Sequence, residues 1–217
     1  MEPLLLASSS PRRSHILRSL GIPFVLADPD VDESLRDHLP PPMRVVALAE
    51  DKARAAASRT ARDTPNLVIA ADTLVCLRLP GGKSGIGSPG DQGLEEIVLG
   101  KPCDRADARR MISLLAGRVH TVHTGLVVLD RRSDRIFPIR SDSFVTFCAI
   151  DESEIEAYLE SGEWEGVAGA YRIQGWTALY ITKIEGSWSG IMGLPIHELY
   201  AILNEAGYRL RPQKAAT

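Results

Sequence analysis

The chain has little of what would tie it to a membrane, to an oxidising compartment or to nucleic acid. Its apolar runs fall short of the roughly 20 residues that cross a bilayer, and Met1 to Leu6 lacks the basic and apolar regions of a signal peptide. Only three cysteines occur in 217 residues, with no C-x-x-C pair, which is typical of a reducing compartment. The net charge of −3 provides no basic excess to attract nucleic acid or anionic lipid. We therefore expect a cytoplasmic protein without a nucleic-acid or membrane partner.

The residues that are present are patterned like a globular α/β protein. The hydrophobic share of 44% and the charged share of 24% are ordinary for such a chain. The interleaving of strand-like and helix-like patterns, with one antiparallel hairpin, predicts an α/β fold with a mixed sheet and flanking helices. No repeat or linker divides the chain, so residues 1–217 are expected to form a single domain. Strands are expected at 4–7, 24–26, 67–71, 119–129, 136–150 and 173–184, and helices begin at Ser10, after Pro42, at Asp104, at Asp151 and near Pro195.

The polar turn after the first expected strand is the first candidate site. Ser8-Ser9-Ser10 precedes Pro11, so Ser10 is a suitable N-cap and Pro11 a suitable first helical residue. A helix N-terminus offers unpaired N–H groups to an anion, and Arg12 and Arg13 could grip phosphate oxygens. The alternative is a capped surface helix with two solvated arginines.

Four charged residues stand where a ligand would need them. Lys52 lies within the apolar stripe of its helix, where a cation needs a partner unless only its aliphatic stem is buried. Asp72 follows an apolar run and is expected at the C-terminal end of a strand, where open α/β sheets bind ligands. It could hold Mg²⁺ or activate a water, or be an ordinary turn residue. Glu33 is a similar case, but its acidic turn could also be solvated surface. Lys101, between Gly100 and Pro102, could meet a phosphate or be an ordinary turn lysine.

Together these segments resemble the Maf family of house-cleaning nucleotide pyrophosphatases. The resemblance implies an elongated, two-lobed α/β fold with a central cleft, like that of the ITP pyrophosphatases, and often a homodimer. It spans nearly the whole chain and is carried by residues 6–13, 31–33, 48–53, 71–73, 100–102, 119–125, 168–175 and 186–195.

The resemblance also implies a reaction and a set of roles. The reaction is hydrolysis of a nucleoside triphosphate to the monophosphate and pyrophosphate with a divalent cation, Mg²⁺ or Mn²⁺. The segment Ile173-Gln174-Gly175 resembles the branch that prefers dTTP and UTP, where the Gln174 amide would read a pyrimidine edge. The implied triphosphate ligands are Ser8, Arg12, Arg13, Lys52 and Lys101, with Lys52, Lys101 and Asp72 as the catalytic set. Glu33 and Asp72 would hold the cation, and Asp72 would also be the general base.

Three departures from the family pattern concern the entrance and the base preference. The connection from Arg78 to Val98 is longer than usual, and its Gly-, Ser- and Pro-rich part, 80–93, is expected to be a mobile loop that could act as a lid or be disordered. Val167 replaces a common Lys, and Gly190-Ile191-Met192 replaces Asn-Val-Val. Two alternatives stay open. One is a substrate such as CTP or a modified pyrimidine nucleotide, and the other is a nucleotide-binding regulator of cell division whose hydrolysis is secondary.

Overall fold

The computed structural model describes residues 1–61, 64–80 and 94–211, which group into two compact units. Unit 1 comprises Met1–Thr73, His123–Asp142 and Ser187–Thr217, and unit 2 comprises Leu74–Val122 and Ser143–Gly186. Three strands contribute residues to both units, β3 (Leu67–Pro80), β5 (Val119–Asp130) and β6 (Arg135–Phe147). Within the described ranges no helix is long and apolar enough to cross a membrane.

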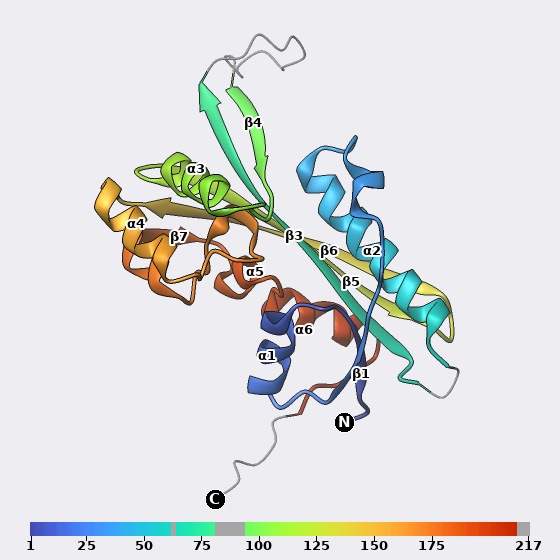
Figure 1. Cartoon of the computed structure of the whole chain (residues 1–217). Helices are drawn as coiled ribbons and strands as arrows, with labels where there is room; N and C mark the ends of the chain where they lie inside the picture. The colour runs from blue at the N-terminus through green and yellow to red at the C-terminus, as the bar shows by residue number, and fades with distance from the viewer. Residues whose placement is uncertain (62–63, 81–93, 212–217) are drawn as a thin grey trace, which may run out of the picture. The chain divides into compact units, whose positions relative to one another are not determined.

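One seven-stranded mixed sheet confirms the predicted fold class. Its strand order is β2-β1-β3-β5-β6-β7, with β4 beside β3 (Figure 1). In unit 1, β1 pairs in parallel with both β2 and β3. In unit 2, β4 pairs antiparallel with β3, and β7 pairs antiparallel with β6. The four shorter strands are β1 (Leu4–Ala7), β2 (Phe24–Ala27), β4 (Leu94–Leu99) and β7 (Ile181–Glu185).

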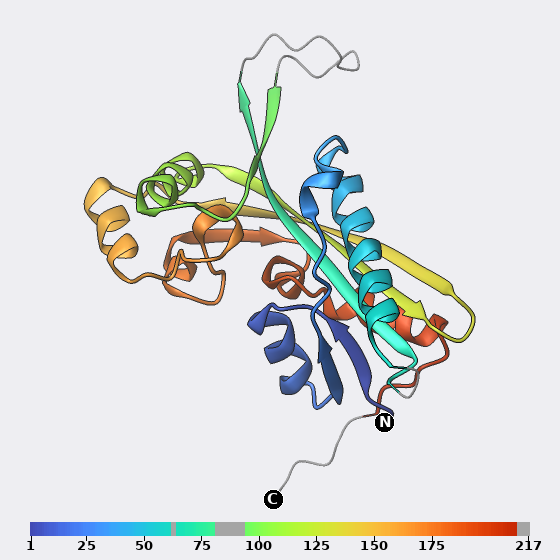
Figure 2. The same ribbon diagram turned by 45° about the vertical axis from the view of Figure 1, so that its right-hand side comes forward.

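Two helices of unit 1 connect its three parallel strands. Helix α1 (Pro11–Ser19) leads from β1 to β2, and α2 (Pro41–Arg59) leads from β2 to β3. These crossovers run in opposite directions across the sheet, so a right-handed connection in each case places the helices on opposite faces (Figures 1 and 2). The last segment of unit 1 adds α5 (Trp188–Met192) and α6 (Ile196–Glu205).

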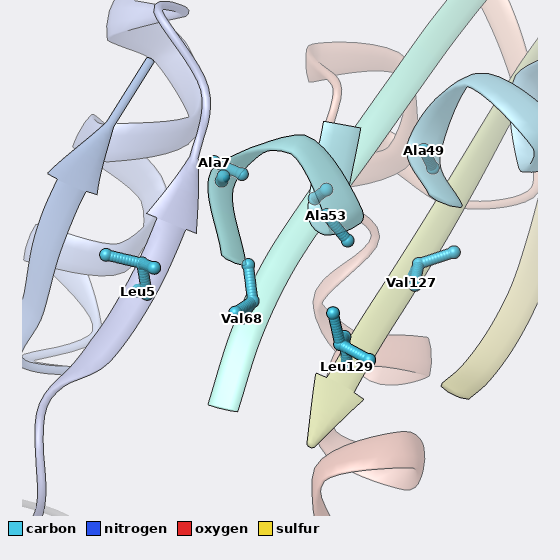
Figure 3. Close-up of a cluster of buried hydrophobic side chains, with 9 residues drawn as sticks. Leu5, Ala7, Ala49, Ala53, Val68, Val127 and Leu129 are labelled. Carbon is cyan, nitrogen blue, oxygen red and sulfur yellow. The ribbon is translucent and has the colours of Figure 1, made fainter. Parts of the chain in front are cut away.

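Small residues let α2 lie close to the sheet. Its alanines pack on side chains of β1, β3 and β5 in a fully buried cluster (Figure 3). Gly125 of β5 marks the closest approach, because an added Cβ would lie 2.2 Å from the Val45 carbonyl oxygen of α2. This close packing fixes the height of α2, and therefore of Lys52, above the strands. The cluster consists of Leu5, Ala7, Ala49, Ala53, Ala56, Val68, Ala70, Val127 and Leu129.

In unit 2, α3 (Arg105–Leu115) packs against α4 (Glu152–Glu160) and against the short 3₁₀ helix η2 (Ala168–Ala170). A second 3₁₀ helix, η3 (Trp176–Tyr180), follows in the chain. The predicted caps of both α-helices are confirmed. Asp104 accepts a hydrogen bond from the Asp107 amide at 2.7 Å, and Asp151 forms a capping box with Glu154. Such caps satisfy amides that have no partner within the helix.

Two predictions about strands are wrong. Asp72 does not end a strand, because β3 continues to Pro80. The second half of β3, from Val75 onward, pairs with β4. Residues 173–184 are not one strand either. Thr177 donates a hydrogen bond to the Arg172 carbonyl at 2.7 Å, and the Trp176 amide donates to Glu163. These two hydrogen bonds favour η3, so only Ile181–Glu185 is extended.

The long connection after β3 is described only in part. Arg78–Pro80 belongs to β3 and pairs with Leu94–Glu96 of β4, and Ile97 and Val98 continue the same pairing. The predicted mobile loop falls mainly on residues 81–93, which lie outside the described residues.

Candidate functional site

Lys52 lies between two carboxylates in unit 1. Its ammonium nitrogen is 2.5 Å from Asp72 Oδ1 and 2.6 Å from Glu33 Oε1. The side chains of Lys52 and Asp72 are only 9% and 8% exposed, whereas that of Glu33 is 49% exposed. A buried ammonium is stable when it is paired and hydrogen-bonded. The reading of Lys52 as a partnered cation is therefore confirmed, and the snorkelling alternative is not.

The sheet explains why Asp72 comes to this place although β3 continues. Ala70 is the last β3 residue paired with β1, opposite Ala7. Asp72 follows two residues later, so it stands just past the carboxyl end of β1, beside the turn that begins at Ser8. The carboxyl ends of parallel strands are the usual ligand position in such sheets.

Arg13 is fixed by three different parts of unit 1. Its Nε donates to the Gly193 carbonyl at 2.7 Å, its Nη1 to Ser8 Oγ at 3.2 Å, and its Nη2 to Thr73 Oγ1 at 3.4 Å. Burial lowers the pKa of the Arg13 guanidinium from its ordinary value, while Asp72 acts in the opposite direction. An arginine stays charged under such a shift. Arg13 is thus a rigidly held cation near Asp72.

Arg12 and Ser10 differ from Arg13 in their setting. Arg12 is half-buried, and its charge contributes to the lowered pKa of Arg13. Ser10 occupies the N-cap position of α1, but its side chain makes no capping hydrogen bond there. Instead, the Ser10 amide donates to Ser8 Oγ at 3.1 Å. The predicted cap is therefore correct in position and wrong in its hydrogen bond.

An open pocket of about 140 Å³ is lined by Ser8, Arg13, Glu33 and Lys52 among other residues. One water needs roughly 10–15 Å³ measured in this way, so the pocket has room for several waters or for phosphate oxygens. Asp72 is not among its walls. They are formed by Ala7, Ser8, Ser9, Arg13, Asp28, Pro29, Asp30, Val31, Glu33 and Lys52.

Glu33 and Asp72 fit a hard cation in chemical type. Both present carboxylate oxygens to one point, which Lys52 Nζ occupies. Among the described residues, no group of three or more His, Cys, Asp and Glu side chains could hold a metal. Mg²⁺ commonly takes one or two carboxylates and completes its shell with substrate phosphates and water. The pair therefore suits a cation that arrives with a phosphorylated ligand.

Lys101 and Gln174 belong to unit 2. Both are exposed. The Gly169 amide donates to the Gly100 carbonyl at 3.0 Å, so the segment that carries Lys101 lies against η2. Gln174 lies in a turn closed by the Gly175 amide on the Arg172 carbonyl at 2.9 Å. Val167, which replaces the common Lys, is buried.

Unit 1 thus brings together Ser8, Arg13, Glu33, Lys52 and Asp72, as the sequence led us to expect. Sequence reasoning missed Thr73, which anchors Arg13, and the pocket wall from Asp28 to Val31. Thr73 adjoins Asp72 in the chain, which was the available signal. Thr73 and the Asp28–Val31 wall meet the other site residues only through folding of distant segments, so no local sequence pattern reveals them.

The polar pocket beside cationic Lys52 and Arg13 offers hydrogen-bond donors and positive charge of the kind that a phosphorylated ligand would need. The comparison with known proteins makes this more specific. Residues 3–206 match the Maf-like protein family. The dTTP/UTP pyrophosphatase of Treponema denticola is 38% identical over 97% of this chain and 100% of its own length. That of Moorella thermoacetica is 41% identical over 94% of each chain, and that of Symbiobacterium thermophilum is 38% identical over 96% of each. The chain belongs to the Maf family.

Proposed function

We propose that this protein hydrolyses dTTP and UTP to the nucleoside monophosphate and pyrophosphate. The observation that carries the proposal is the pairing of buried Lys52 with Asp72 and Glu33 beside the Ser8 and Arg13 pocket. The names of the relatives support the same reaction. Modified pyrimidine nucleotides are included in the proposal, and the physiological role would be house-cleaning of the nucleotide pool.

The proposed mechanism needs positioning and charge more than covalent catalysis. Phosphoryl chemistry depends on neutralising oxygens as a water attacks in line. Arg13 and Lys52 supply two fixed positive charges, and Ser8 supplies a hydroxyl within reach of Arg13. Asp72 would take the proton of the attacking water. Glu33 and Asp72 would hold Mg²⁺ or Mn²⁺, which contributes further charge neutralisation when bound.

The remaining residues complete the proposed assignment. Arg12 and Lys101 would bind phosphate oxygens, because guanidinium and ammonium groups donate charge-assisted hydrogen bonds to phosphate. Gln174 would read the pyrimidine, since its amide both donates and accepts hydrogen bonds. We also propose a cytoplasmic location, where the nucleotide pool is found, and a homodimer, which light scattering during gel filtration would test.

The decisive test is pyrophosphate release from a panel of triphosphates with Mg²⁺ or Mn²⁺. The panel contains dTTP, UTP, CTP, dCTP, GTP, 7-methyl-GTP, ITP and ATP. Asp72→Asn removes the base without changing shape, and the matched control is Asp134→Asn at a residue whose side chain is 79% exposed. We expect release from dTTP and UTP, its loss in Asp72→Asn and its retention in the control.

The other outcomes separate the remaining candidates. Release from a different base would keep the mechanism and move the specificity. Near-normal rates in Asp72→Asn would refute the role of that residue. Nucleotide binding with no pyrophosphate release from any triphosphate would replace this proposal with the nucleotide-binding regulator.

A further inference from the structure

Glu33 is held less firmly by its own element than Lys52 or Asp72. It is the first residue of η1 (Glu33–Arg36), a 3₁₀ helix of four residues without a buried side chain. Half of the Glu33 side chain is exposed, yet its carboxylate lies 2.6 Å from Lys52. A long, exposed side chain on a short element loses conformational freedom when it is held in one place. Contacts between η1 and α2 therefore contribute to where the Glu33 carboxylate stands.

Arg36, at the other end of η1, forms a bidentate ion pair with α2. Its Nε is 2.7 Å from Asp51 Oδ2, and its Nη2 is 2.8 Å from Asp51 Oδ1. Two parallel N–H···O bonds fix the orientation of both groups as well as their distance. Asp51 immediately precedes Lys52 in the chain. The two links between η1 and α2, Arg36 to Asp51 and Glu33 to Lys52, therefore use adjacent residues of one rigid helix.

The segment from residue 29 to residue 37, which contains η1, is attached to α2 at further points. Each charged residue in these ion pairs faces a residue of opposite charge on α2. Arg59, at the end of α2, donates to the Pro29 carbonyl at 3.1 Å and pairs with Asp30 at 3.0 Å. Arg44, near the start of α2, pairs with Asp37 at 2.5 Å. A slip of the segment along α2 would bring like charges together, which is unfavourable. The charges of the segment at 33, 36 and 37 are negative, positive and negative, and those of their α2 partners at 52, 51 and 44 are the reverse.

We propose that Arg36 and Asp51 are positioning residues that hold the Glu33 carboxylate at Lys52 and at the proposed cation site. The inference rests on the proposed function, because the cation role of Glu33 belongs to it. Arg36 and Asp51 touch neither the pocket nor the reacting groups. They act by setting where Glu33 stands.

The experiment compares Arg36→Ala, Asp51→Ala and the charge-swapped double variant Arg36→Asp with Asp51→Arg. Arg54→Ala is the matched control, because it removes the same charge as Arg36→Ala, from the helix that carries Asp51, at a residue that pairs with Glu50 and Asp134 instead. The first readouts are kcat, KM and the Mg²⁺ concentration for half-maximal rate with UTP. The second is the affinity for Mn²⁺ with the non-hydrolysable α,β-imido analogue of dUTP, measured from the free-Mn²⁺ resonance.

We expect kcat/KM to fall roughly tenfold in each alanine variant, since small displacements of a catalytic group are costly. The Mg²⁺ requirement should rise about fivefold, a coupling of ordinary size, and Mn²⁺ binding should weaken in parallel. The swapped double variant should recover most of both losses, and Arg54→Ala should match the wild type. Recovery in the double variant separates positioning from a general loss of stability.

Either alanine variant behaving like Arg54→Ala in all readouts would overturn the inference. A folded double variant, with the wild-type melting temperature and no recovery, would overturn it as well. If the wild type released no pyrophosphate, the proposed function would fail, and the Mn²⁺ titration alone would decide the inference. Unchanged Mn²⁺ affinity in the alanine variants would then be the refuting result.

Discussion

Replacing Gly125 by alanine should damage both the stability of the protein and its proposed site. The added Cβ would lie 2.2 Å from the carbonyl oxygen and 2.3 Å from the carbonyl carbon of Val45, and 2.6 Å from the Val46 amide nitrogen. These are backbone atoms of α2, so rotation of a side chain cannot relieve the contact. To restore an ordinary contact, the first turns of α2 must retreat by roughly 1 Å from β5, because Cβ contacts shorter than about 3.4 Å are rare.

The expected cost follows from the size of this displacement. Overpacking a well-filled core costs about 1–3 kcal/mol, and a backbone contact belongs at the upper end of that range. In a protein of this length, 1 kcal/mol corresponds to a melting temperature change of about 2–4 °C. Gly125→Ala should therefore melt about 6–12 °C below the wild type. Because Lys52 lies two turns further along the displaced helix, kcat/KM should fall as well, by as much as about 100-fold.

The assay is thermal unfolding followed by circular dichroism, together with pyrophosphate release from UTP. Gly100→Ala is the control for stability, because no atom lies within 4 Å of its added Cβ. Equal melting temperatures for the two variants would refute the packing argument. A lower melting temperature with unchanged kcat/KM would show instead that the position of Lys52 does not depend on Gly125.

Three further predictions use single residues. Lys52→Met should abolish pyrophosphate release and cost about 3 kcal/mol of unfolding free energy, because removing one partner strands a buried carboxylate at Asp72; an unchanged urea midpoint would contradict this. Burial lowers the pKa of His120 from 6.5 to about 3, so the unfolded chain binds the extra proton between these values and the folded state loses stability as pH falls through that window, by about 2 kcal/mol at pH 5. The loss of stability between pH 8 and pH 5, measured by urea unfolding, should be smaller in His120→Gln than in the wild type. In His197→Gln, a control at an exposed histidine, it should equal that of the wild type. Gln174→Ala should change the ratio of UTP to CTP turnover more than the Mg²⁺ requirement, whereas an equal loss for all bases would argue against a reading role.

Local signals in the sequence predicted most of the elements and the burial of Lys52. The caps at Asp104 and Asp151 are set by residues within one turn, so they can be read from a short window. Lys52 could be recognised because the helical period placed it in an apolar stripe. Such features need no knowledge of distant segments.

The failures have the opposite origin. The second half of β3 pairs with β4, which follows a long insertion, so the charged Asp72 within the apolar run was mistaken for the end of the strand. The ion pair between Arg36 and Asp51 joins two charged residues that are individually ordinary. In residues 173–180, the side chain of Thr177 competes with strand pairing, and apolar periodicity does not register that competition.

The division of unit 1 into three separate stretches has a consequence for synthesis of the protein. The first 73 residues contain β1, α1, β2, α2 and the start of β3, but the cluster beneath α2 also needs Val127 and Leu129. The third stretch, from Ser187 onward, is translated last. A nascent chain can therefore complete the cluster beneath α2 only after Leu129 has left the ribosome, and the whole of unit 1 only after the third stretch has followed. Such long-range closure folds slowly and exposes strand edges to aggregation in the meantime. Neither half of the chain, expressed alone, would contain a complete unit 1.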